Sequence, residues 1–446
     1  MMRNFILLLI AVIVSFNTLA QNSSASYHSQ SFVLQSSANA SAFPEANVVL
    51  GFPAFSNVNL GMQWPLSLND FLQKQMDDSL HFNLPLLRSN LKSENILNSS
   101  FRNQLFHFGL KIGNKKNIFV YIGDELVVDA GMQFSNKLVD YLTQGNANFI
   151  NQRMVFDSQK IEFTAYNSLY LGTAIKVNKK LEIGARIKLL RGIANIHTQK
   201  LKFSAFTDST ASPIFSTSLS SDILIQTSGR GAADKSLPFD PSLNTGFAID
   251  LGASYVFTDQ FTASIALNDV GSITWDKLNN SLFTTDGEKE FDIVGLSQTS
   301  AGGEDLLAQL ETLSDSLLLT LQPSEVLGAY STKLNPKLFL GLSYSLNSKH
   351  SFSALYNWRR NFSKGVSAIS VGYQLQLLKS LELLTSLSRF SENTSLAAGF
   401  VWSPGPVQLH VLVDNIMFVD LFDAKSLFLQ FGLSFRFGEI TNAAKK

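Results

Sequence analysis

Alternation of apolar residues with small or polar ones at every second position is the feature that most constrains the fold of this chain. From residue 426 to residue 437 the odd positions are all Leu or Phe, and the even positions are mainly Ser, Gln, Gly and Arg. Successive side chains of a β-strand point to opposite faces, so a segment with this pattern forms a strand with one apolar face. The same pattern recurs at 181–189, 247–257, 338–346 and 371–377. The chain is therefore predicted to be built from antiparallel strands.

Similar segments extend this prediction along most of the sequence. The expected strands span residues 46–52, 57–64, 103–113, 117–128, 160–177, 181–196, 198–206, 214–227, 244–257, 260–275, 325–334, 337–347, 350–362, 366–378, 381–390, 394–402, 406–414 and 426–437. Short polar segments such as 113–116 and 403–405 separate many of them and favour tight turns. Consecutive strands joined by tight turns form an up-and-down meander, which is the topology of a closed barrel.

A soluble β-sandwich would also alternate, because one face of each sheet would meet solvent. A membrane barrel explains more of the sequence. One face of the strands is rich in Leu, Phe, Val, Ile and Tyr, and the other carries Gly, Ser, Gln, Asp, Lys and Arg. A lipid-facing exterior and a polar interior require this division. We therefore expect an all-β fold, a transmembrane antiparallel up-and-down β-barrel of about 14 strands, with short helices in its loops or lumen.

The first 20 residues have the arrangement of a secretory signal peptide. Arg3 precedes an apolar run from residue 5 to residue 16, and Thr18 and Ala20 place small residues at the −3 and −1 positions of a cleavage site. The run is shorter than the roughly 20 apolar residues that a spanning helix needs. We expect cleavage after Ala20, with residues 21–446 forming a single barrel domain in the outer membrane of a Gram-negative envelope.

Composition excludes several classes of function. Lys and Arg number 35, which equals the 35 Asp and Glu, so the chain carries no electrostatic footprint for nucleic acid. It has no Cys, and its 6 His are scattered without the spacing that metal ligands use. The sequence also lacks a nucleophile elbow, a phosphate loop and a dinucleotide-binding glycine pattern. We therefore expect no enzymatic activity, no cofactor, no metal and no nucleic-acid partner.

Three segments with helical patterns interrupt the strands. Residues 304–321 place Leu at helical spacing between acidic residues, within a long loop near 275–325. Residues 71–79 and 136–143 are shorter candidates. Each of these two short segments is expected either inside the barrel or folded over its mouth.

Two segments have a more distinctive sequence. Residues 244–275 contain a GxxxDLGxxY strand followed by an LxDxGxIxW strand, and residues 43–65 read FPEANVVLGFPAFSNVNLGMQWP. In both, the chain resembles an uncharacterised family of Bacteroidetes-type outer-membrane β-barrels, a domain of unknown function. That family is loosely similar to the long-chain fatty-acid channel barrels and to barrels associated with type IX secretion. The resemblance implies location and fold, and it supplies no catalytic residues.

Polar residues on the inward faces are the candidates for a functional site. Asp250 lies opposite the apolar face of its strand, and Gly252 beside it leaves room for another segment of chain. Pairing of Asp250 with a lumenal Arg is expected ahead of ligand binding. Asp269 breaks the apolar face of the next strand, and Trp275 is expected at the membrane interface. The residues predicted to line the lumen are Lys111, Arg186, Lys188, Asp250, Arg359, Gln408, His410 and Arg436.

Two functions fit these observations. The first is a channel or transporter for small hydrophobic solutes, for which an apolar pocket and a side opening between strands would be diagnostic. The alternative is a structural or docking barrel of a secretion or surface-assembly complex, acting through its loops at 207–245 and 275–325. The expected partners are the lipid bilayer, a small hydrophobic ligand and, for the alternative, an envelope protein.

Overall fold

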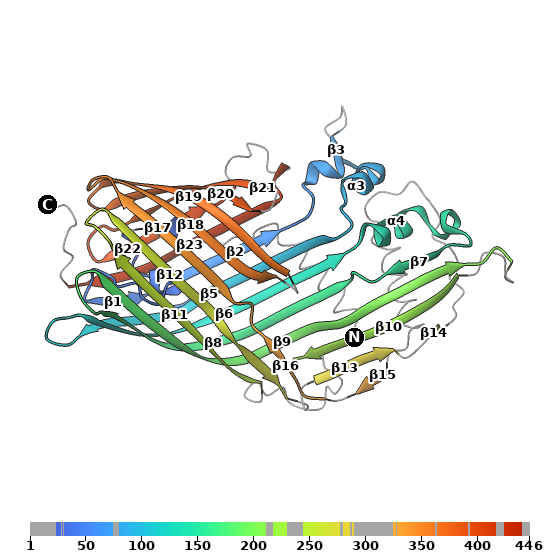
Figure 1. Cartoon of the computed structure of the whole chain (residues 1–446), viewed down its shortest axis with the longest axis horizontal. Coiled ribbons are helices and arrows are strands. Elements are labelled where there is room, and N and C mark those ends of the chain that lie inside the picture. Colours follow the sequence, from blue (N-terminus) through green and yellow to red (C-terminus); the bar gives the residue numbers. More distant parts are fainter. Residues whose placement is uncertain are drawn as a thin grey trace.

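The chain forms a closed 14-stranded antiparallel β-barrel (Figure 1). The structure is a computed structural model that describes part of the chain. The residues described are 24–27, 29, 31–74, 80–210, 217–229, 244–276, 280–285, 288–289, 324–326, 328–361, 364–390, 393–415 and 423–438. The expected fold class and strand number are confirmed. The segment assigned to a signal peptide and the helix expected at 304–321 lie outside the described residues.

The wall of the barrel follows the order of the chain. The short strands β1 (Val48–Gly51) and β2 (Asn57–Gln63) together form the first strand of the wall, between β23 and β5. The other 13 strands are β5 (Asn95–Ile112), β6 (Ile118–Phe134), β8 (Lys160–Lys176), β9 (Leu181–Thr207), β11 (Thr245–Val256), β12 (Phe261–Trp275), β17 (Lys337–Ser345), β18 (His350–Asn361), β19 (Lys364–Leu378), β20 (Leu381–Phe390), β21 (Asn393–Trp402), β22 (Val407–Val413) and β23 (Ser426–Phe437). The barrel closes because β1 and β2 pair with β23 on one side and with β5 on the other.

The two ends of the barrel differ. Tight turns such as 113–117 and 346–349 lie together at the left in Figure 1, and longer connections lie at the right. The elements at the right are β3 (Leu72–Lys74), β4 (Leu80–Phe82), α3 (Leu84–Asn90), α4 (Asn136–Gln144), β7 (Arg153–Phe156), β10 (Thr217–Ser228), β13 (Asn280–Thr285), β14 (Glu288–Lys289), β15 (Ser324–Val326) and β16 (Tyr330–Lys333). We call these the short-turn end and the long-loop end. In outer-membrane barrels the short turns face the periplasm.

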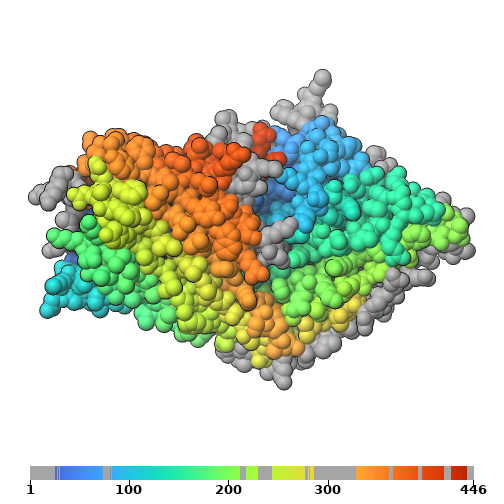
Figure 2. Space-filling view, viewed as in Figure 1, coloured from blue at the N-terminus to red at the C-terminus, as the bar shows by residue number. Residues whose placement is uncertain are grey.

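Long strands extend the long-loop end on one side of the barrel. The segment 95–207, cyan to green in Figure 2, continues well past residues 330–402, which are orange. β9 alone has 27 residues, whereas β17 has 9. The sequence-based expectation of separate strands at 181–196 and 198–206 was wrong, because β9 runs unbroken, paired first with β11 and then with β10.

Apolar side chains cover the outside of the wall. Leu189 of β9, Val371 of β19 and Leu251 of β11 are 57%, 58% and 50% exposed, and the residues on either side of each are buried or half-buried. Isolated in water, such a surface would be unfavourable, whereas a bilayer solvates it. Among the described residues, no helix is both long enough and apolar enough to cross a bilayer.

Of the two short helices predicted from the sequence, the structure confirms one. Residues 136–143 form α4, and its N-cap residue Ser135 accepts a hydrogen bond from the Leu138 backbone N–H. The helix expected at 71–79 is wrong for the described residues 71–74, because β3 pairs there with β4, which follows the segment. An isolated helix of this length is marginal, and the cross-strand hydrogen bonds of a hairpin give its backbone partners.

Candidate functional site: the barrel lumen

A β-bulge directs two carboxylates into the lumen. The register of β11 against β12 shifts between Ile249 and Leu251, so that Asp250 faces both Asn268 and Asp269. Asp269 has a φ of 62°, a left-handed conformation that Asp tolerates better than most residues, and its N–H donates to Oδ1 of Asp250 over 2.7 Å. The side chains of the two aspartates are buried.

The same bulge reverses the faces of β12. Ile265, before the bulge, is exposed on the outer surface, and Ile273 and Trp275, after it, are fully buried. Trp275 donates from Nε1 to Oγ1 of Thr332 over 2.8 Å and stacks on Tyr330. The expectation that Trp275 lies at the membrane interface was therefore wrong, because one extra residue in a strand exchanges its two faces.

Four cations surround these aspartates. Arg186 and Lys188 of β9 pair with Asp250, with 2.8 Å between Nζ of Lys188 and Oδ2. Lys188 and Lys337 contact the two oxygens of Asp269 at 2.5 and 3.1 Å. Arg102 lies 3.3 Å from Asp269 and also faces two further carboxylates. The members of this group, the ion-pair layer, are Arg102, Glu125, Asp129, Arg186, Lys188, Asp250, Asp269 and Lys337.

The ion-pair layer is electrically neutral, since four cations face four carboxylates. A buried charge is stable only when it is paired and hydrogen-bonded, and removal of one partner leaves the other uncompensated. The layer therefore connects β5, β6, β9, β11, β12 and β17 through buried charges that depend on one another.

The N-terminal segment fills the lumen on the short-turn side of this layer. We call its described residues, 24–27, 29 and 31–46, the plug. Phe32 and Leu34 are buried against Phe119, Tyr121 and Leu412 of the wall. This apolar contact explains why the plug stays inside a barrel whose other lumenal side chains are largely polar.

Side-chain hydrogen bonds fix the plug to the wall. Ser29 Oγ donates to Oε2 of Glu382 over 2.7 Å, and the same oxygen accepts from the Ser31 backbone N–H over 3.1 Å. Gln408 bonds the plug backbone twice, accepting from the Val33 N–H and donating to the Ser31 carbonyl. These bonds satisfy the plug backbone where it has no strand partner.

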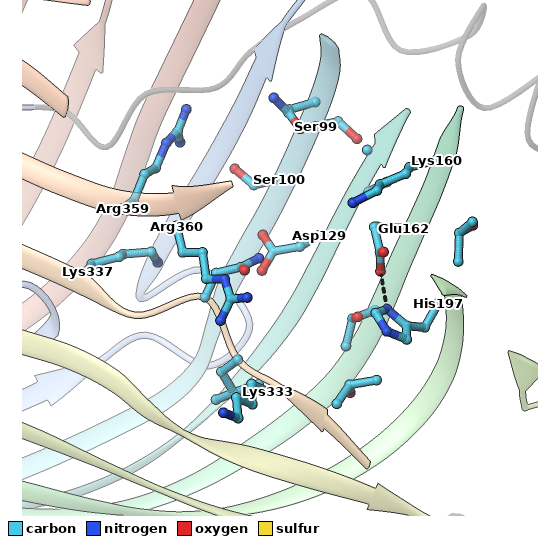
Figure 3. Close-up of a pocket in the computed structure, with 18 of the residues that line it drawn as sticks. Ser99, Ser100, Asp129, Lys160, Glu162, His197, Lys333, Lys337, Arg359 and Arg360 are labelled. Atoms are coloured by element: carbon cyan, nitrogen blue, oxygen red, sulfur yellow. Dashed lines mark hydrogen bonds and ion pairs between the residues drawn. The ribbon is translucent and has the colours of Figure 1, made fainter. Parts of the chain in front are cut away.

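A cavity of about 550 Å³ lies on the long-loop side of the ion-pair layer (Figure 3). Polar and charged side chains from β5, β6, β8, β9, β16, β17 and β18 line most of it. The labelled ones are Ser99, Ser100, Asp129, Lys160, Glu162, His197, Lys333, Lys337, Arg359 and Arg360. A second cavity of about 60 Å³ is lined by residues of both the ion-pair layer and the plug.

The residues predicted to line the lumen occupy four places. Arg186, Lys188 and Asp250 belong to the ion-pair layer. Gln408 and His410 contact the plug, since the His410 ring lies 4.6 Å from the Phe32 ring. Arg359 lines the larger cavity.

The two remaining predicted residues lie at the short-turn end. Nζ of Lys111 donates to the Glu45 carbonyl over 2.6 Å, and Nε of Arg436 donates to the Gly405 carbonyl over 3.3 Å. They fix backbone at the rim, so the structure does not bring them together with the ion-pair layer or the cavity.

Several lumenal residues escaped the sequence analysis. Arg102 was missed because the expected strand began at residue 103, whereas β5 begins at Asn95. Glu382 had a usable signal, since it is an acidic residue on the polar face of an otherwise apolar and small-residue strand, between Leu381 and Leu383. Lys160 is the first residue of its strand, so the alternation before it does not show which face of the sheet its side chain occupies.

Residues 41–414 match the model of a family described as "Family of unknown function (DUF5723)". The chain belongs to this family. No curated protein matches it. This DUF5723 member is a closed 14-stranded β-barrel with an apolar outer surface, and among its described residues no group of three or more His, Asp or Glu could hold a metal ion.

Solved structures with a similar course of the chain include two toluene transporters. Ralstonia pickettii TbuX has 11% identity and a TM-score of 0.42, with 88% of this chain and 89% of that chain covered. Pseudomonas putida TodX has 10% identity and a TM-score of 0.43, with the same coverage of 88% and 89%. A Pseudomonas aeruginosa FadL homologue has 11% identity and a TM-score of 0.41, with 89% and 91% covered.

Proposed function

We propose that this DUF5723 member is a solute channel of the outer membrane that its own N-terminal segment closes. One observation carries the proposal: the lumen holds a polar cavity toward the long-loop end, and the plug fills the same lumen toward the short-turn end. A barrel that served only as a rigid anchor would need no cavity within its lumen.

The contacts between the plug and the wall are of kinds that a conformational change can break, so the plug can leave the lumen. It is held by hydrogen bonds from side chains such as Glu382 and Gln408 and by two apolar clusters, and its described residues do not pair with a strand of the wall. Individual hydrogen bonds of this kind contribute about 0.5–3 kcal/mol each, so their loss is within reach of a conformational change. Without the plug, the described barrier along the lumen would be the ion-pair layer, which side chains alone form.

A hydrophobic solute, the cargo expected from the sequence, has one specific observation in its favour. β2 registers with β5 at Asn57 and Gln104, whereas its residues 58–63 register with β23. Apolar side chains gather beside this seam, with Met62 and Phe428 buried and Leu97 packed against them. A weakly paired seam is where a hydrophobic solute could pass between lumen and bilayer.

The docking alternative depended on loops at 207–245 and 275–325. Most of these residues lie outside the described part of the chain, and no contact within the described part favours a protein partner over a solute.

Conductance of single barrels in a planar bilayer tests the channel. The mature full-length chain is compared with a variant that lacks residues 24–42, which ends ahead of β1. We expect the full-length chain to conduct rarely and the shortened barrel to conduct steadily. A Phe32→Glu variant, which places a charge in the apolar cluster, provides a second route to opening that keeps the chain length. Folded variants that conduct no more than the full-length chain would overturn the proposal.

A further inference from the structure

β2 and β5 are neighbours in the wall (Figure 1), and in the described part of the chain they register at one position, Asn57 with Gln104. Among the described residues, β2 pairs along residues 58–63 with β23 alone, and β5 pairs along residues 95–103 with β6 alone. We call this boundary the lateral seam. Because backbone hydrogen bonds hold neighbouring strands together, the wall separates most easily along the lateral seam.

The lateral seam borders the larger cavity. Asn98, Ser99 and Ser100 line this cavity and belong to the edge of β5 that faces the seam, on the long-loop side of Arg102 and the ion-pair layer. Nδ2 of Asn98 is a buried atom without a hydrogen-bond partner among the described residues, which is unfavourable while the seam is closed. A solute that leaves the cavity through the seam reaches the bilayer without crossing the ion-pair layer.

The backbone is irregular on both strands where the lateral seam begins. In the short connection between β1 and β2, Ala54 has a φ of 63°, a left-handed conformation that is unfavourable for Ala, and its N–H donates to the Leu105 carbonyl over 2.7 Å. On β5 the register against β6 shifts between Gln104 and Phe106. The pair of Asn57 with Gln104 therefore lies between a strained connection and a bulge, where a small movement separates the two strands.

Two wall residues connect Asn57 to the plug. Oδ1 of Asn57 accepts from Nε2 of Gln430 over 3.0 Å, and Oε1 of Gln430 accepts from Oγ of Ser26 in the plug over 2.9 Å. Nε2 of His410 lies 3.3 Å from the same oxygen of Asn57, and the centre of its ring lies 4.6 Å from that of Phe32 in the plug. The residue that joins β2 to β5 is thus held by the two side chains that the plug contacts.

The plug keeps these contacts dry and correctly oriented. Asn57, Gln430 and His410 are each at most 3% exposed, and hydrogen bonds in such surroundings are stronger than bonds that compete with water. A side-chain amide carries its donor and its acceptor on opposite sides, so the bond from Ser26 directs Nε2 of Gln430 toward Asn57. Departure of the plug removes this bond and admits water. The cavity of about 60 Å³, which Ser26, Asn57 and Gln430 line, gives the side chains space to turn.

We propose that Asn57 is a positioning residue that links the plug to the lateral seam. With the plug in place, Gln430 and His410 hold Asn57 in register with Gln104, and the seam stays closed. Release of the plug frees Asn57, the unpaired part of the seam extends toward β1, and the larger cavity opens to the bilayer for a hydrophobic solute. The inference rests on the proposed channel function and names the regulation of its lateral route.

Hydrogen–deuterium exchange of the full-length barrel in lipid nanodiscs, followed by mass spectrometry of its peptides, tests this link. Phe32→Glu displaces the plug and should speed exchange in residues 52–63 and 98–107 about tenfold, as expected for the loss of about one hydrogen bond. Asn57→Ala should have a similar effect while Phe32 is unchanged. The double variant should exchange no faster than either single variant, because both substitutions break one link. Effects that multiply would show that Asn57 is only a structural part of the wall and would overturn the proposal.

Ser26→Ala removes the same link from the plug side without altering the wall, and it should also speed exchange in residues 52–63 and 98–107. This variant serves as the test should Asn57→Ala not fold. Unchanged exchange at the lateral seam in folded Ser26→Ala and Phe32→Glu barrels would overturn the link.

Asn195→Ala is the matched control. Asn195 is 1% exposed on β9, and its side chain bonds the Phe163 carbonyl and the Tyr330 hydroxyl without contacting the plug. The substitution should leave exchange at the lateral seam unchanged. Strands β20 and β21 contact the plug and are paired along their whole lengths, so their exchange should stay slow in Phe32→Glu. A rise of equal size at the seam in Asn195→Ala, or in β20 and β21 in Phe32→Glu, would indicate general loosening and would contradict the link.

Two further outcomes separate this inference from the channel function. Steady conductance of Phe32→Glu barrels with unchanged exchange at the lateral seam would overturn the link and leave the channel in place. Faster exchange at the seam in Phe32→Glu and in Asn57→Ala, without a further rise in the double variant, in barrels that never conduct would overturn the channel and leave the link.

Discussion

Gly184 of β9 and Gly252 of β11 lie directly opposite each other in the barrel wall, and the backbone of the plug packs against both. A Cβ atom at Gly184 would overlap the Ala40 carbonyl, and one at Gly252 would overlap the Asn39 side chain. Neither glycine has a positive φ, so close approach of the plug is what requires them. The two glycines therefore allow the plug to pack closely against the wall.

Gly184→Val is therefore expected to displace the plug while the barrel stays folded. The added side chain competes with the Ala40 carbonyl for the same space, and overpacking of this kind costs about 1–3 kcal/mol. Chymotrypsin added to the purified barrel should cut at Phe32 faster than in the unmodified chain. Ala185→Val introduces the same side chain on the other face of β9 and should leave the cleavage rate unchanged.

Glu382→Gln should loosen the same segment through a different contact. Its Oε2 accepts from both Ser29 and the Ser31 backbone, and bonds to an ionised acceptor are stronger than those to a neutral amide. We expect single barrels in a bilayer to open about tenfold more often, in line with a loss of about 1.4 kcal/mol. Glu182→Gln removes a carboxylate that pairs with Lys176 near the short-turn end, and its opening frequency should match that of the unmodified chain.

Asp250→Asn should destabilise the barrel more than any change at its surface. The substitution leaves Arg186 and Lys188 buried with one carboxylate fewer, and breaking a buried pair costs about 3–5 kcal/mol. Urea unfolding in lipid vesicles measures the loss. Adding Arg186→Gln to Asp250→Asn should cost less than the sum of the two single changes, because both act on one ion pair. Additive losses would show that the pair is not energetically coupled.

The sequence predicted the wall of the barrel well because alternation reports burial directly. Every second residue of β17, β19 and β23 faces the outside of the wall, and local pattern and global fold agree there. The polar inward residues Arg186, Lys188 and Asp250 were recognisable for the same reason. Their pairing partners were not, since Arg186 and Asp250 are 64 residues apart in the chain and meet only through strand register.

The parts that could not be predicted depend on irregular backbone or on contacts between distant segments. The alternation of residues does not reveal the bulge at Asp269, so the sequence could not predict that Trp275 faces the lumen. The plug has no strand pattern at all, and its place in the lumen follows from Gly184, Glu382 and Gln408, which lie far away in the sequence.

Quenching of tryptophan fluorescence by brominated lipids tests the bulge. Trp275 is fully buried inside the barrel, and Trp402 is 44% exposed on its outer surface. A variant that keeps Trp275 and replaces Trp64, Trp358 and Trp402 by Phe should show little quenching, and the variant that keeps Trp402 instead should be quenched strongly. Bromine quenches at short range, so the difference reports directly on which face of the strand each ring occupies. Strong quenching of Trp275 would mean that β12 runs without the bulge, and Asp269 would then lose its lumenal partners.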